Sequence, residues 1–148
     1  MRSSYSLILE PLEDRLAPAF AGTPWPDAEH LTLSFAPDGT PGGNAPSVLF
    51  QTLNARAPTA AWQLAALRAF QTWAVNANIN FGLVGDQGQP LGAVGLPQGD
   101  PRFGDIRLAA YPMSRQALAV GSPFNPAAGT YSGDVKLNSL KSFSMGAR

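Results

Sequence analysis

One stretch, "TAAWQLAALRAFQTWAVNA" at 59–77, constrains the fold of this chain more than any other. Apolar side chains recur in it at intervals of three and four residues, which is the spacing of one face of an α-helix. Thr59 follows Pro58 and is expected to be the N-cap of this helix. A helix with so bulky an apolar face must bury it, so we predict that this face belongs to the core. The members of the face are Trp62, Ala66, Phe70, Trp73 and Ala77, widened by Leu67 and Ala69.

Short alternating segments on both sides of this helix predict a sheet. The first is 31–35, which ends at a Pro-Asp-Gly turn, and the next is 79–83, which follows the helix directly. Segments 106–110 and 135–138 also alternate, and the apolar segment 116–122 between them is expected at an edge of the sheet. This order predicts an α+β fold of two layers, in which the sheet packs on the helix.

Composition excludes several classes of protein. The chain has 148 residues, enough for one domain with its own core, and its formal net charge is zero. It has no block of Lys and Arg, so we expect neither nucleic acid nor an anionic membrane surface as a partner. Without cysteine it can form neither disulfides nor thiolate metal sites. No apolar run approaches the roughly 20 residues of a transmembrane helix, so we expect no membrane span.

The segment 1–27 is expected to lie outside the domain. The motif "LEPLEDR" at 9–15 resembles a leader found at the start of many surface and exported proteins of planctomycete-type bacteria. That resemblance implies an extracellular or cell-surface location. The other interpretation is a disordered, mildly amphipathic tail. Residues 17–28 are rich in Pro, Ala and Gly and predict a linker, so the domain is expected at 28–148.

Five segments in order resemble the N-terminal half of the catalytic domain of matrixins, which are zinc endopeptidases of the metzincin group. The segments are "HLTLSF" at 30–35, "AFQTWAVNANINFGLV" at 69–84, "GDIRLAAYP" at 104–112, "ALAV" at 117–120 and "YSGDVKLNS" at 131–139. The resemblance covers residues 28–147. It implies part of a zincin-like fold, with a twisted mixed sheet on one long helix. It also implies a secreted metalloendopeptidase that acts on peptide or protein substrates.

The zinc ligands of that family are missing from this chain. The family hallmark is H-E-x-x-H-x-x-G-x-x-H/D, in which histidines bind zinc and the glutamate is the general base. The single histidine is His30, which we interpret as a solvated residue at a strand end, so we name no catalytic residue and expect no bound zinc. Val120 and Lys136 stand where the family places histidine ligands of a structural zinc. We therefore expect a truncated domain (a fragment, an interrupted gene or a shortened product) that lacks the catalytic helix.

Calcium is the cofactor that the resemblance leaves open. In the family, the aspartate of the "DI" strand, carbonyls of the Gly-rich turn and the aspartate of that turn supply oxygen ligands, which Ca²⁺ prefers. The other interpretation of Asp134 is a turn residue whose side chain bonds its own backbone. A second family calcium site is expected to be lost, because Asn138 and Lys141 occupy its acidic positions. The positions that match the first calcium site are Asp105, Thr130, Ser132 and Asp134.

Three functions follow as hypotheses. In the first, the chain is the N-terminal part of a matrixin-like peptidase and is inactive alone, and the backbone of Leu118 and Ala119 pairs with an extended substrate by strand addition. In the second, the chain is complete and acts as a non-catalytic binding or scaffold domain at the cell surface. In the third, it is a decayed gene product of marginal stability. Because half a domain leaves its sheet and helix partly uncovered, we expect the isolated chain to aggregate or to be molten.

Overall fold

The computed structural model describes residues 22–77, 79–114 and 116–144. Within these residues the chain forms an α+β fold, as the sequence predicts. The leader motif at 9–15 lies outside the described residues. The elements in chain order are η1 (Ala28–His30), β1 (Leu31–Phe35), α1 (Leu49–Asn54), α2 (Thr59–Ala77), β2 (Phe81–Leu83), β3 (Ile106–Tyr111), β4 (Ala119–Gly121), η2 (Pro126–Tyr131) and β5 (Val135–Asn138).

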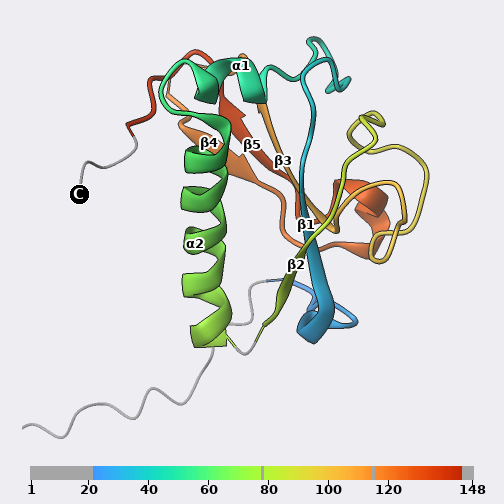
Figure 1. Cartoon of the computed structure of the whole chain (residues 1–148). Helices are drawn as coiled ribbons and strands as arrows, with labels where there is room; N and C mark the ends of the chain where they lie inside the picture. Colours follow the sequence, from blue (N-terminus) through green and yellow to red (C-terminus); the bar gives the residue numbers. More distant parts are fainter. Residues whose placement is uncertain (1–21, 78, 115, 145–148) are drawn as a thin grey trace, which may run out of the picture.

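The strands of this part of the chain form one five-stranded mixed sheet in the order β2-β1-β3-β5-β4 (Figure 1). β1 pairs in parallel with β2 and β3, and β3 pairs in parallel with β5. β4 pairs antiparallel with β5 and places Val120 opposite Lys136. β3 is the central strand, and every one of its residues is buried. The edges are β2 and β4, and all residues of β4 are exposed.

The main core lies between the sheet and the two α-helices (Figure 1). Trp62 of α2 is buried and makes edge-to-face contacts with Phe35 of β1 and Phe50 of α1, at ring-centroid distances of 5.2 and 5.1 Å. Further along α2, the ring of Phe70 packs edge-to-face on that of Phe81 in β2, 5.3 Å away. The aromatic face of α2 therefore joins helix and sheet, as predicted for these positions.

The prediction for the same face is wrong in the C-terminal half of α2. Trp73 is 72% exposed, Ala69 and Ala77 are exposed too, and Ala74, which the pattern leaves out, is buried. α1 lies beside the N-terminal end of α2 (Figure 1), where it covers Trp62. Among the described residues no element covers the same side of α2 near its other end. Periodicity identifies an apolar stripe, but it carries no information on where a neighbouring element ends.

The starts of the two helices also differ from the prediction. α1 was not predicted, and two N–H groups in its first turn donate to the carboxylate of Asp38 at 2.8 and 2.9 Å. Thr59 is not the N-cap of α2, because the N–H groups of Ala61 and Trp62 donate to the carbonyl of Pro58. The Thr59 hydroxyl instead donates to the side chain of Asn54. β2 is shorter than the predicted segment 79–83. In the described ranges no helix has both the length and the apolar character that crossing a bilayer requires.

The predicted linker belongs to the domain from Trp25 onward. The ring centroid of Trp25 lies 4.4 Å from that of Phe124, and its indole packs against Gly133, where a Cβ atom would collide with it. Asp27 and Gln98 exchange two hydrogen bonds, at 2.7 and 3.1 Å. The domain therefore begins before residue 28. A Pro- and Ala-rich composition did not distinguish an extended segment that packs from one that does not.

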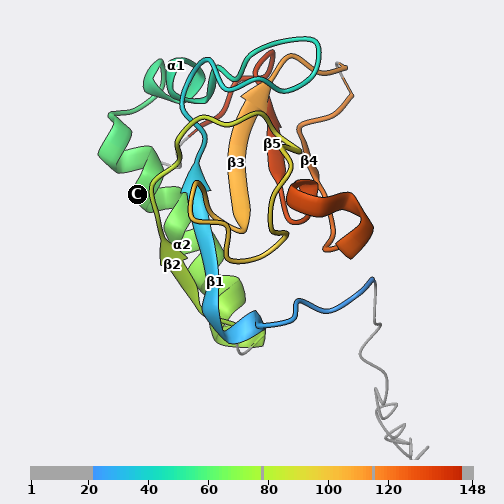
Figure 2. The same ribbon diagram turned by 90° about the vertical axis from the view of Figure 1, so that its right-hand side faces the viewer.

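The connection between β2 and β3, residues 84–105, covers the sheet face opposite the helices (Figure 2). A second and smaller cluster of buried apolar residues lies under it, made of Ala36, Leu91, Ala109 and Tyr111. The Tyr111 hydroxyl donates to the carbonyl of Thr40 at 3.1 Å, and burial raises its pKa to about 12. β3 thus lies between two layers, which explains why it is buried on both faces.

Candidate functional site

The exposed edge strand β4 is the first candidate site. Only the side of β4 that faces β5 is paired within the sheet. The N–H of Asn138 donates to the carbonyl of Leu118 at 2.9 Å, so these two residues form a hydrogen-bonded pair. Because such pairs alternate with non-bonded ones along an antiparallel ladder, the N–H and C=O groups of Ala119 and Gly121 point away from β5. An extended peptide could therefore add to this edge.

The two residues predicted to bind substrate differ in their position at this edge. Ala119 directs its backbone groups outward, as the prediction requires. The carbonyl of Leu118 is occupied by Asn138, although its side chain is 58% exposed. Gly121, which the sequence analysis did not single out, takes the second outward position. The alternation of the ladder decides this, and it depends on a register that only the fold provides.

Asn138 holds the segment that precedes β4. Its side chain is fully buried, and its Oδ1 accepts a hydrogen bond from the N–H of Met113 at 3.1 Å. Its Nδ2 donates to the carbonyls of Ser114 and Ala117 at 2.9 and 2.8 Å. The sequence analysis considered Asn138 only as a lost calcium ligand. In the structure, this side chain fixes the entry of the chain into the edge strand.

A hollow of about 390 Å³ lies beside β4 on the sheet face opposite the helices. It combines an apolar wall with the stem of one basic side chain, Lys136, so it could receive a side chain of a peptide that pairs with β4. Its lining consists of Gly42, Asn44, Ala45, Tyr111, Pro112, Met113, Val120 and Lys136.

The turn 129–134 buries an aspartate against the central strand. Gly129 and Gly133 have φ angles of 55° and 81°, which favour glycine and let the chain turn tightly. The side chain of Asp134 is fully buried, and its Oδ1 accepts from the N–H of Arg107 at 3.3 Å. Burial raises the pKa of Asp134 to about 7, opposed by the nearby Arg107 charge. The side chain thus bonds the neighbouring strand and not its own turn, contrary to the second interpretation of this residue.

The other predicted calcium positions lie near this turn, but their side chains already have partners. Both carboxylate oxygens of Asp105 accept backbone N–H groups, at 2.6 and 2.9 Å. The hydroxyls of Thr130 and Ser132 donate to backbone carbonyls at 2.6 and 2.7 Å. These contacts tie adjacent loops together. The family pattern uses the carboxylate at Asp105 and the main-chain carbonyls at Thr130 and Ser132, and each Asp105 oxygen already accepts one backbone N–H.

One buried carboxylate oxygen of this turn is a candidate ligand for a calcium ion. Oδ2 of Asp134 is buried and has no hydrogen-bond partner among the described residues, an arrangement that a hard cation would satisfy. The carbonyl of Asp105 lies close by, since a Cβ atom on Gly133 would be 3.1 Å from it. In the described ranges no three His, Asp or Glu side chains group closely enough to hold a metal. A site of this composition would bind calcium weakly.

The residues at the family's structural zinc positions do not fit zinc. The Nζ of Lys136 lies 4.8 Å from the centre of the Tyr131 ring, a cation–π contact, and Val120 is 47% exposed. Neither an ammonium nor an alkyl group can ligate zinc. His30 lies exposed beside the start of β1, as interpreted, and its hydrogen bond with Asp27 at 2.9 Å raises its pKa.

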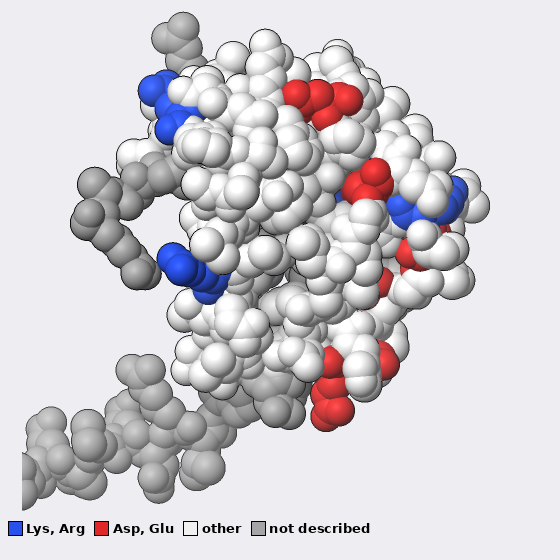
Figure 3. Space-filling model, in the orientation of Figure 1, with Lys and Arg blue, Asp and Glu red and all other residues white. Residues whose placement is uncertain are grey.

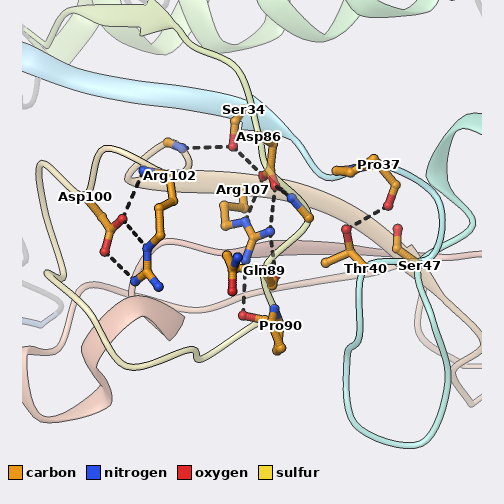
Figure 4. Close-up of polar contacts among 12 residues, drawn as sticks. Ser34, Pro37, Thr40, Ser47, Asp86, Gln89, Pro90, Asp100, Arg102 and Arg107 are labelled. Carbon is orange, nitrogen blue, oxygen red and sulfur yellow. Dashed lines mark hydrogen bonds and ion pairs between the residues drawn. The ribbon is translucent and has the colours of Figure 1, made fainter.

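Arg107 and Asp86 form a buried ion pair that the sequence analysis did not predict (Figure 4). Arg107 donates through Nε and Nη2 to the two carboxylate oxygens of Asp86, both at 2.8 Å, and the two side chains are 0% and 1% exposed. The guanidinium lies 4.3 Å from the centre of the Phe103 ring. A possible signal was an arginine in a strand of otherwise small and apolar residues. Its partner stands in a loop that no pattern links to it.

A second pair in the same connection lies nearer the surface (Figure 4). Arg102 donates to Asp100 through Nε and Nη2 at 2.9 and 2.8 Å, and the Arg102 side chain is 31% exposed. The hydrogen bond from Arg102 holds the pKa of Asp100 at about 2. Both partners belong to one short turn, so this pair shapes the loop locally.

Comparison with models of protein families found no match to this chain. Comparisons with curated proteins and with solved structures found none either.

Proposed function

We propose that this chain is the sheet-bearing half of a matrixin-like zinc metalloendopeptidase domain, which is secreted or lies at the cell surface. The observation that carries the proposal is the sheet. Four of its strands, β2, β1, β3 and β5, are parallel, and the exposed strand β4 lies at the edge beside β5 and runs antiparallel to it. Its strands and helix coincide with the five segments on which the family resemblance rests. The "LEPLEDR" leader supports the location.

In this proposal the chain contributes substrate positioning. An extended peptide pairs with the outward backbone groups of Ala119 and Gly121, and one of its side chains enters the hollow beside Lys136. Asn138 keeps the edge in place by holding the preceding segment, so little ordering is required on binding. Preorganised main-chain donors and acceptors bind a peptide without dependence on its sequence, which suits an endopeptidase.

The zinc-dependent chemistry of the family would come from a helix beyond β5, because no three His, Asp or Glu side chains among the described residues group closely enough to hold zinc. The chain after β5 crosses to the helix layer, where Phe143 packs against the main core. There Arg56 donates to the hydroxyl of Ser142 at 2.8 Å. A continuing segment would therefore start beside α1, on the face of the sheet that carries α2.

Calcium is part of the proposal as a stabiliser of the turn 129–134. By the family pattern, Oδ2 of Asp134, the Asp105 carboxylate and the carbonyls of Thr130 and Ser132 would hold it. When bound, the ion would neutralise the buried carboxylate and brace the turn that leads into β5. It has no part in bond cleavage.

The DNA that follows codon 148 tests the peptidase assignment. Translation in all frames is expected to show H-E-x-x-H within a few tens of codons. If no frame contains it, the chain is not part of such a peptidase. Binding of peptide would then favour the non-catalytic surface domain.

Strand addition is tested by NMR titration of the full chain with a soluble hexapeptide of alternating Val and Thr. Ala119→Pro removes an outward N–H and is expected to abolish binding, since proline cannot donate at a sheet edge. The control Val120→Ala changes a side chain on the same strand but keeps every N–H, and should still bind. Equal binding by the Ala119→Pro chain would overturn the role of β4.

A further inference from the structure

The connection on the sheet face opposite the helices needs specific contacts to stay in place. Residues 84–104 cross this face without any helix or strand of their own. The apolar cluster beneath them is small, and only Leu91 of that cluster comes from the connection itself. Phe103 of the connection is also buried, at 3% exposed, so Leu91 and Phe103 supply its large buried apolar side chains, and the polar contacts described next add to them.

Arg107, near the start of β3, reaches this connection. Besides its two bonds to Asp86, its Nη2 donates to the carbonyl of Gln89 at 2.8 Å, and Nη1 lies 3.4 Å from the carbonyl of Pro90. Its guanidinium also stacks near Phe103. Figure 4 shows the polar contacts of Arg107 with Asp86, Gln89 and Pro90. With Phe103, this side chain of the central strand contacts the connection near both of its ends.

Asp86 links the same connection to a second strand. Its Oδ2 accepts from the hydroxyl of Ser34 in β1 at 2.8 Å, and its Oδ1 accepts from the N–H of Gly88 at 2.9 Å. The Ser34 hydroxyl in turn accepts from the N–H of Gly104 at 3.0 Å, at the far end of the connection. The carboxylate therefore has every lone pair directed at a donor of the sheet or of the connection.

The connection also supports the turn that carries Asp134. The hydroxyl of Thr130 donates to the carbonyl of Ala93 at 2.6 Å, and the ring of Tyr131 packs directly on Gly92, where no side chain would fit. A displaced connection would remove both contacts.

We infer that the Asp86–Arg107 pair is the device that docks residues 84–104 on the sheet and, through them, positions the turn 129–134. A buried charge that loses its partner is strongly unfavourable. The two side chains are therefore either buried together under the connection, or both exposed to water when the connection is displaced. This inference is independent of the peptidase proposal, and no zinc or calcium enters it.

Hydrogen exchange of the full chain, followed by mass spectrometry, tests the inference. In Asp86→Asn, peptides from 84–93 are expected to lose protection on the order of 100-fold, because Arg107 loses its counter-charge. Peptides from α2 and β3 are expected to stay protected, and those from 129–134 to lose part of their protection. Ser34→Ala removes one bond to Asp86 and one from Gly104, and is expected to lower protection of 84–93 about tenfold.

The matched control is Asp100→Asn, which breaks the more exposed ion pair of the same connection. It should change protection of 84–93 by less than about fivefold. The inference is overturned if 84–93 stays protected in Asp86→Asn, or if α2, β3 and the connection lose protection by the same factor. Should Asp86→Asn fail to fold, Ser34→Ala decides by the same comparison.

Discussion

Two buried carboxylates beside Arg107 differ in how fully they are satisfied. Asp86 accepts hydrogen bonds from the Arg107 guanidinium, a serine hydroxyl and a backbone amide. Asp134 accepts one long bond from the Arg107 backbone and leaves Oδ2 without a partner among the described residues. The raised pKa of Asp134 reflects that shortage, since burial without donors disfavours the charged form. The first carboxylate fastens a loop, whereas the second has the oxygen at which we propose that calcium binds.

At this scale we predict that calcium raises the melting temperature of the full chain at pH 8. Binding at 100 times the dissociation constant would add about 2.7 kcal/mol to the free energy of unfolding. In Asp134→Asn, which keeps the shape but loses the charge, the effect is expected to disappear. Scanning fluorimetry with and without calcium measures both.

Asp38→Asn is the control for that experiment, because Asp38 is an exposed carboxylate that caps α1. It should lower the melting temperature somewhat yet preserve the calcium response. A calcium shift of equal size in Asp134→Asn would rule out the proposed site.

At the scale of the element, α2 carries two tryptophans with opposite environments. Trp62 is 1% exposed, touches aromatic rings from β1 and α1, and donates from its indole N–H to Asn54 at 2.7 Å. Trp73 is 72% exposed. Both belong to the stripe that periodicity identifies. The difference arises because α1 covers only one end of the helix.

We therefore predict that Trp62→Ala lowers the free energy of unfolding by about 3–5 kcal/mol, through lost burial and a cavity in the main core. Trp73→Ala is the matched change on the same helix and should alter it by no more than about 0.5 kcal/mol. Urea denaturation followed by circular dichroism gives both values. Similar losses for the two variants would show that Trp73 is covered in solution.

At the scale of the whole molecule, the two faces of the sheet are covered by different means. Helices and aromatic side chains cover one face, and a polar connection held by an ion pair covers the other. In the view of Figure 3 the middle of the surface is uncharged, with charged side chains nearer its margins. α2 leaves three large apolar side chains exposed, namely Leu64, Trp73 and Val75 at 47%, 72% and 75%.

We predict that the isolated chain self-associates through the exposed Trp73 of α2, in line with the expected tendency to aggregate. Trp73→Glu is expected to shift sedimentation-velocity profiles at high concentration toward the monomer. Val94→Glu is the control, because Val94 is 96% exposed in the connection on the other face. A monomer at every concentration, or an equal effect of both variants, would contradict this prediction.

The sequence by itself determined the α+β class, the extent of α2 and the positions of β1, β3 and β5. Local periodicity encodes these features, because apolar residues recur every three or four positions in a helix and every second position in a half-buried strand. Only the tertiary structure decided which part of the α2 face is covered and which backbone groups of β4 point outward. It alone paired Asp86 with Arg107 and left one oxygen of Asp134 without a donor. These features join residues far apart in the chain, and burial and register arise only when the layers assemble.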